Sequence, residues 1–135
     1  MNKQKGFTII ELIVVIAIIA VLAGIVMINV AGYITKSKDA AIRSDLSNIA
    51  LGMGACYAEL GTYVGCPANT TYVQANLLTD VDTQNGTNGS TPAFGVPTKD
   101  TYCASVVLAS SASSTCVDST GVTKDNSTCS AAACP

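Results

Sequence analysis

Histidine is absent from the 135 residues of this chain. Without it, the Ser-His and Cys-His pairs that activate a nucleophile in many hydrolases cannot form. Structural zinc sites draw on histidine or on closely spaced cysteines, and no Cys-x2-Cys pair occurs in this chain either. The composition therefore predicts no enzyme, no zinc site and no cofactor.

Charge is also scarce. Charged residues make up 12% of the chain, and after residue 60 the positive side chains are Lys99 and Lys124. Direct binding of nucleic acid needs a basic surface, so we do not predict it. Asp118 and Asp125 lie near a Thr-Gly turn and are weak calcium candidates, but they lack the ligand spacing of an EF-hand, which favours solvated loop acids.

One segment carries no charge at all, the apolar residues 12–28. As a helix, residues 7–28 would be about 33 Å long, close to the roughly 30 Å hydrocarbon core of a membrane. Lys3 and Lys5 precede this run with no acid beside them, so the positive-inside rule keeps the N-terminus in the cytoplasm. We therefore predict a single-pass segment in the cytoplasmic membrane.

Two ordinary explanations of this segment compete. A secretory signal peptide has a shorter apolar region and then a small-residue cleavage site, whereas residues 29–33, Asn-Val-Ala-Gly-Tyr, contain no clear site. A plain membrane anchor leaves Glu11 unexplained. An acid at the centre of a membrane helix costs about 2.5 to 3.5 kcal/mol, and less near its end. Glu11 is therefore a functional candidate that needs a partner.

The residues around Glu11 resemble a known family. Residues 5–12, Lys-Gly-Phe-Thr-Ile-Ile-Glu-Leu, are similar to the class III signal of type IV prepilins and type II secretion pseudopilins. The resemblance implies cleavage between Gly6 and Phe7 by a membrane prepilin peptidase, which also N-methylates Phe7. It further implies that Glu11 pairs with the N-terminal amine of a neighbouring subunit, and that a cytoplasmic ATPase and a membrane assembly platform build the filament.

Apolar residues continue at helical spacing beyond the membrane segment. They are Ile42, Leu46, Ile49, Met53, Tyr57 and Leu60. Because Gly61 then provides a C-cap signal, we predict one helix over residues 7–60. Residues 7–34 are its membrane and polymerisation half, and residues 35–60 are its amphipathic half. Many family members carry a proline in the middle of this helix, and this chain has none there.

Residues 61–135 predict a small globular β head. Residues 101–108 and 114–118 are strand-like and predict a hairpin in a small antiparallel sheet over the helix. Apolar anchors are expected at residues 76–78 and 94–96, and a loop at residues 83–92. The predicted fold is α+β, with a long N-terminal helix, a small sheet and a disulfide-stapled C-terminal region. Residues 1–6 are the predicted leader peptide.

Because large apolar residues are few in this head, its core alone is too small to stabilise it, and we expect covalent cross-links. Six cysteines follow the membrane segment, and an even number in an exported domain predicts disulfides. They allow 15 connectivities, which the sequence cannot resolve. We favour sequential pairs because short loops close readily. The predicted pairs are Cys56–Cys66, Cys103–Cys116 and Cys129–Cys134.

These features together predict a structural subunit. We expect a major pilin that forms a homopolymer, first as a single-pass membrane precursor and then in an extracellular filament that serves adhesion, twitching motility or DNA uptake. The alternatives are a major pseudopilin of a type II secretion system and a minor or tip pilin. In the latter, residues 83–92 would be the place to look for a binding surface. A membrane-anchored enzyme has only the generic anchor in its favour.

Overall fold

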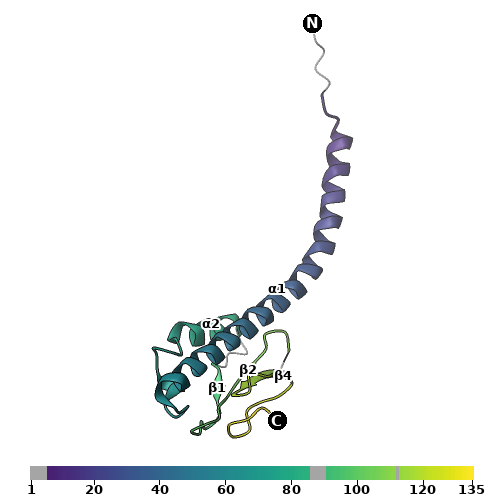
Figure 1. The fold of residues 1–135 in the computed structure, drawn as a ribbon. Helices are drawn as coiled ribbons and strands as arrows, with labels where there is room; N and C mark the ends of the chain where they lie inside the picture. The colour runs from purple at the N-terminus through teal and green to yellow at the C-terminus, as the bar shows by residue number, and fades with distance from the viewer. Residues whose placement is uncertain (1–5, 86–90, 112) are drawn as a thin grey trace. The chain divides into compact units, whose positions relative to one another are not determined.

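The longest element is α1, a single α-helix of 52 residues over Ile9–Leu60 (Figure 1). It belongs to a computed structural model that describes residues 6–85, 91–111 and 113–135. The chain divides into two compact units, one ending at Ile34 and the other running from Thr35 to Pro135. Lys3 and Lys5 and the centre of the predicted 83–92 loop lie outside the described residues. The predicted long helix is confirmed.

The second unit is built on the amphipathic half of α1. As predicted, the helix buries a stripe of four apolar residues, Ile42, Leu46, Ile49 and Met53. The stripe then continues to Cys56. Of the other predicted members, Tyr57 is half-buried and Leu60 is 51% exposed. Cys56 is drawn inward by its disulfide to Cys66, and Tyr57 instead stacks on Tyr63 at the edge of the core, with ring centroids 4.5 Å apart.

A second helix, α2, occupies Ala75–Asn85 and follows the short 3-10 helix η1 at Cys66–Ala68. The predicted start of a loop at residue 83 is therefore wrong. Val81 is fully buried, and Leu77 and Leu78, from the predicted anchor, pack half-buried against the same core. These three apolar residues share one helical face, and burial of that face stabilises the helix in an otherwise polar segment.

The sheet has four antiparallel strands in the order β1-β2-β3-β4. They are β1 (Ala93–Phe94), β2 (Cys103–Val107), β3 (Ser114–Asp118) and β4 (Thr123–Asp125). The predicted hairpin is confirmed, because β2 pairs with β3. Phe94 packs against the core as predicted, but Val96 is 78% exposed and is not an anchor, because the chain leaves the sheet after β1.

Both faces of the β2–β3 hairpin are covered. Alternate residues of a strand point to opposite faces, and one set joins the core with α1. That set is Ala104, Val106 and Val117. The opposite, outer face carries Cys103 and Cys116, which are fully buried against Cys129 and Cys134. We call residues 126–135 the C-terminal segment, and it covers this outer face.

The C-terminal segment approaches the backbone of Gly95 very closely. A Cβ atom at Gly95 would lie 1.7 Å from the carbonyl oxygen of Ala131 and 3.5 Å from the Cβ of Cys129. Only a residue without a side chain admits this approach. The backbone N–H of Ser127 also donates to the carbonyl of Ser114, at 3.2 Å. The segment is therefore packed against the sheet by backbone contacts as well as by its cysteines.

Candidate functional site

The start of α1 is organised by Thr8 and Glu11. One carboxylate oxygen of Glu11 accepts hydrogen bonds from the backbone N–H and the hydroxyl of Thr8, each at 2.8 Å. In return the N–H of Glu11 lies 3.3 Å from the Thr8 hydroxyl oxygen and donates to it. This reciprocal arrangement is a capping box, and it satisfies backbone donors that a helix start leaves unpaired.

The capping box gives Glu11 a partner within its own chain. Sequence reasoning missed Thr8, although the Thr-x-x-Glu pattern before an apolar run is a known signature of this arrangement. Gly6 and Phe7 lie before the helix, outside any helix or strand, and Phe7 is 83% exposed. A carboxylate is thus held at the helix start, four residues after Phe7 and the predicted cleavage point.

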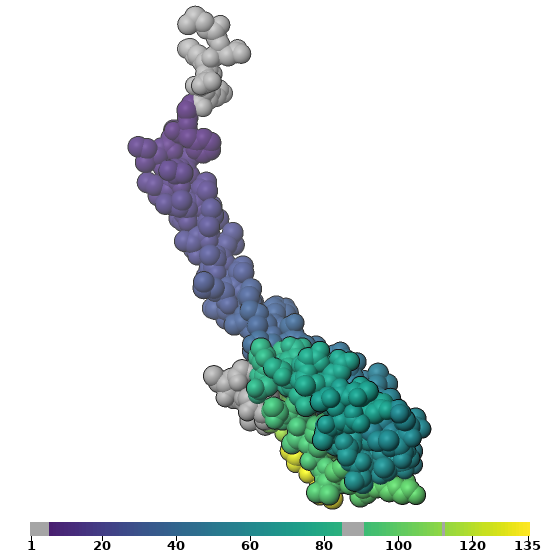
Figure 2. All heavy atoms as spheres, turned by 90° about the vertical axis from the view of Figure 1, so that its left-hand side faces the viewer, coloured from purple at the N-terminus to yellow at the C-terminus, as the bar shows by residue number. Residues whose placement is uncertain are grey.

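The first unit presents an apolar helical surface. Every large apolar side chain from Phe7 to Ile34 is between 45% and 83% exposed. In Figure 2 these side chains, in purple to blue, line the face of the helix that the view presents. Among the described residues, α1 is the one helix long and apolar enough to cross a membrane. Exposed apolar surface on this scale requires lipid or a protein partner to cover it.

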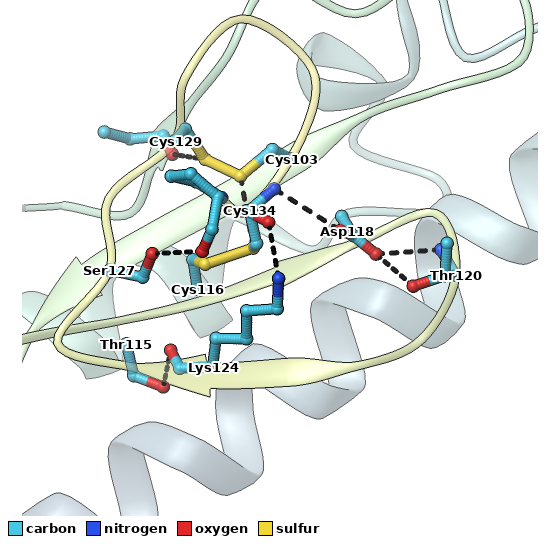
Figure 3. Close-up of a disulfide and its surroundings, with 11 residues drawn as sticks. Cys103, Thr115, Cys116, Asp118, Thr120, Lys124, Ser127, Cys129 and Cys134 are labelled. Carbon is cyan, nitrogen blue, oxygen red and sulfur yellow. Dashed lines mark hydrogen bonds between the residues drawn. A yellow bond between two sulfur atoms is a disulfide. The ribbon is translucent and has the colours of Figure 1, made fainter.

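Three disulfides staple the second unit. They are Cys56–Cys66, Cys103–Cys129 and Cys116–Cys134. The first agrees with the predicted pairing and ties the end of α1 to η1. The other two fasten the C-terminal segment to strands β2 and β3 (Figure 3).

The predicted pairs Cys103–Cys116 and Cys129–Cys134 are wrong, and the strand register explains why. Cys103 lies opposite Asp118, whereas Cys116 lies opposite Ser105. The two cysteines are therefore diagonal neighbours, for which a separation of about 7 to 8 Å is usual. Disulfides prefer Cα atoms closer than about 6.8 Å. Each cysteine bonds instead to the segment that lies across it.

Two charged residues hold Cys134 in place. The carboxylate of Asp118 accepts hydrogen bonds from the N–H of Thr120 at 2.9 Å and from the N–H of Cys134 at 3.3 Å. The ammonium of Lys124 donates to the carbonyl of Cys134 at 3.0 Å. Burial alone would raise the pKa of Asp118, but the hydrogen bonds from Thr120 and Cys134 outweigh it, so the pKa is lowered.

The second weak calcium candidate, Asp125, has a different partner. Its carboxylate forms an ion pair with the guanidinium of Arg43 on α1, and this hydrogen bond lowers the pKa of Asp125. Asp118 and Asp125 thus each have a protein partner, and they act as structural links: one to the C-terminal segment and one to α1.

Comparisons with known proteins agree with these features. A family model described as the prokaryotic N-terminal methylation motif matches residues 1–27. The chain is 40% identical over 80 residues to fimbrial protein Q of Moraxella bovis and 49% identical over 47 residues to a type IV major alpha-pilin of the same organism. It is also 33% identical over 97 residues to a type IV major fimbrial protein of Dichelobacter nodosus.

The N-terminal motif and these relatives support the type IV pilin family for this chain. The matches cover 58%, 35% and 70% of this chain and 51%, 30% and 58% of the respective relatives. The chain therefore spans about half or less of the length of the first two relatives. No solved structure matches this chain. The matched motif contains the capping box and most of the exposed apolar surface of the first unit.

Proposed function

We propose that this chain is a type IV pilin, a structural subunit of a type IV filament that performs no chemistry itself. It enters the cytoplasmic membrane with its N-terminus in the cytoplasm, is cut between Gly6 and Phe7, and is N-methylated at Phe7. Residues 7–34 then leave the lipid and pack against the same residues of other copies. Residues 35–60, as the second half of the helix, carry the head formed by residues 61–135.

The observation that carries this proposal is the exposed apolar surface of the first unit, with a single carboxylate at its start. Lipid covers such a surface in a membrane precursor, and other copies of the same helix cover it in a filament. A plain anchor would satisfy the first requirement, and in it Glu11 would serve the capping box alone. The relatives named as major fimbrial proteins support the filament.

Glu11 gives the assembly its register in this proposal. Cleavage after Gly6 creates an α-amine on Phe7, which is cationic near neutral pH. A carboxylate and an ammonium are each costly in an apolar environment and stabilise each other when paired. Glu11 therefore exchanges its hydrogen bonds with Thr8 for an ion pair with the Phe7 amine of a neighbouring copy. The capping box keeps the carboxylate satisfied until that neighbour arrives.

The partners follow from this sequence of events. A membrane prepilin peptidase cuts and methylates the precursor, and a cytoplasmic ATPase drives extrusion through a membrane platform. The homopolymer is the final partner. Adhesion, motility and DNA uptake belong to the assembled filament.

Mass spectrometry of filaments sheared from cells tests the proposal. We expect a chain that begins at Phe7 and carries one additional methyl group, as the dominant protein of the preparation. A trace amount would assign it to a minor or tip subunit instead. Retention in the membrane fraction under conditions that yield filaments of another composition, or an uncut N-terminus in the filament, would contradict the proposal.

A further inference from the structure

Four cysteine sulfurs gather at the outer face of the sheet, and they lie closer together than two separate disulfides require. Cys103 is bonded to Cys129, and Cys116 to Cys134. The sulfur of Cys103 nevertheless also lies 3.5 Å from the sulfur of Cys134 (Figure 3). The sulfurs of Cys103, Cys116 and Cys134 all lie within 4.8 Å of one another. A third pairing, Cys103 with Cys134, is therefore within reach of a small side-chain movement.

The four sulfurs differ in their access to solvent. Cys103 and Cys116 are fully buried and Cys134 is 5% exposed, whereas Cys129 is half-buried between exposed neighbours. A thiol from solution therefore meets Cys129 first. Thiol–disulfide exchange displaces the sulfur that is not attacked, so attack on Cys129 leaves Cys103 as a thiolate beside Cys134.

The surroundings of Cys134 favour a second exchange. The ammonium of Lys124 donates a hydrogen bond to its carbonyl at 3.0 Å. The carboxylate of Asp118 accepts a hydrogen bond from the N–H of Cys134. These two contacts hold the Cys134 backbone in place while its sulfur changes partner, so Cys134 stays within reach of Cys103.

We propose that this cluster is a disulfide-exchange site for a dithiol, which converts the pairs Cys103–Cys129 and Cys116–Cys134 into the single bond Cys103–Cys134. The dithiol attacks the Cys129 sulfur, the Cys103–Cys129 bond breaks, and the second thiol of the reagent then releases Cys129 as a thiol. The Cys103 thiolate attacks the Cys134 sulfur, and Cys116 departs as a thiolate and takes up a proton. The dithiol loses two electrons and two protons and becomes a disulfide.

The exchange changes what the C-terminal segment is tied to. Before it, the segment is fastened at two points, to β2 through Cys129 and to β3 through Cys134. Afterwards it is fastened at one point, to β2 through Cys134. Cys129 and Cys116 become thiols, and the accessible one, Cys129, is then open to modification or to a new disulfide.

Limited reduction of the full chain tests this proposal. The protein in detergent micelles, with all three disulfides intact, is treated with less than one equivalent of dithiothreitol, quenched with acid and alkylated. Peptide mapping without further reduction is expected to find label on Cys116 and Cys129 and a bond between Cys103 and Cys134. Label on Cys103 and Cys129, with Cys116–Cys134 intact, would show simple reduction and overturn the proposal. Label on all four cysteines at once would overturn it as well.

A pair of matched variants tests the geometry separately. Cys116→Ser with Cys129→Ser leaves Cys103 and Cys134, which we expect to join in air with the loss of two hydrogen masses. Cys103→Ser with Cys134→Ser also removes both native bonds but leaves Cys116 and Cys129, and we expect these to stay as thiols. Failure of the first pair to join, or equal oxidation of both variants, would contradict the proposed juxtaposition.

Discussion

Asp45 places a carboxylate within the buried face of α1. Its residue is 9% exposed, and its Oδ2 atom has no hydrogen-bond partner among the described residues. Burial raises the pKa of Asp45, and the negative charge of Asp80 on α2 raises it further. Two carboxylates on α1 and α2 thus act against the packing of these helices whenever both are ionised.

We expect Asp45→Asn to stabilise the folded head at neutral pH by about 1 kcal/mol, because it removes a buried negative charge that Asp80 repels and whose Oδ2 atom accepts no hydrogen bond from the described residues. The pKa of Asp45 is higher in the folded state, so ionisation weakens folding as the pH rises through the unfolded and folded values. The gain should therefore shrink towards about pH 3, where the carboxyl is protonated in both states. Urea unfolding at several pH values measures it. The exposed Asp82→Asn is the matched control, and equal gains from both variants would contradict this account.

A second prediction concerns the carboxylate of Glu11 and its proposed role in filament assembly. Glu11→Ala removes the carboxylate but leaves the apolar helix and the bond after Gly6 unchanged. We therefore expect normal membrane insertion and normal cleavage, together with a loss of filaments. Immunoblotting of membrane and sheared fractions separates these steps. Thr8→Ala is the informative companion, because it breaks the capping box and keeps the carboxylate. Wild-type filament yield from Glu11→Ala would refute the proposed ion pair.

At the scale of elements, the sequence predicts best where one periodic signal decides the structure. The apolar residues from Ile42 to Met53 predict the buried face of α1, and the strand-like runs 101–108 and 114–118 predict the hairpin. The sequence does not predict helix α2, because Leu77 and Leu78 fit a short apolar anchor equally well. The pairing of the other four cysteines, Cys103–Cys129 and Cys116–Cys134, is not predicted because it depends on strand register, and one-residue shifts in register cannot be read from composition.

The contact at Gly95 yields a prediction for the same elements. A methyl group there meets the Ala131 carbonyl, so Gly95→Ala should displace the C-terminal segment and cost about 1 to 3 kcal/mol, as overpacking commonly does. Gly54→Ala is the control, because nothing lies within 4 Å of its Cβ position on α1. It should instead stabilise the helix by up to about 1 kcal/mol. Thermal unfolding of both variants compares them, and a neutral Gly95→Ala would contradict the close packing.

At the scale of the molecule, the two units differ in where their apolar side chains lie. All buried core residues lie in the unit that begins at Thr35, and the exposed apolar helix lies in the other. A signal in the first 28 residues was enough to predict the membrane half and its relatives. No pattern in the sequence predicts the contacts between the C-terminal segment and the sheet, because those contacts join residues far apart in the chain.

This division predicts that residues 35–135 form a soluble, monomeric domain after oxidation, whereas the full chain requires detergent. The fragment keeps the whole buried core and all six cysteines. Gel filtration and circular dichroism, with mass spectrometry for the three disulfides, measure this outcome. A fragment that aggregates or stays unfolded once its disulfides have formed would show that the membrane half contributes to the folding of the head.

The disulfides Cys103–Cys129 and Cys116–Cys134 affect the order in which the head can complete its folding. A chain that crosses the membrane behind its N-terminal helix delivers its cysteines in sequence order, and Cys103 and Cys116 arrive before either of their partners. For that interval the two thiols are diagonal neighbours on one hairpin, and neither of their final partners is present. The order of delivery thus opposes the order of pairing, and the head reaches its final connectivity only after Cys129 and Cys134 have followed.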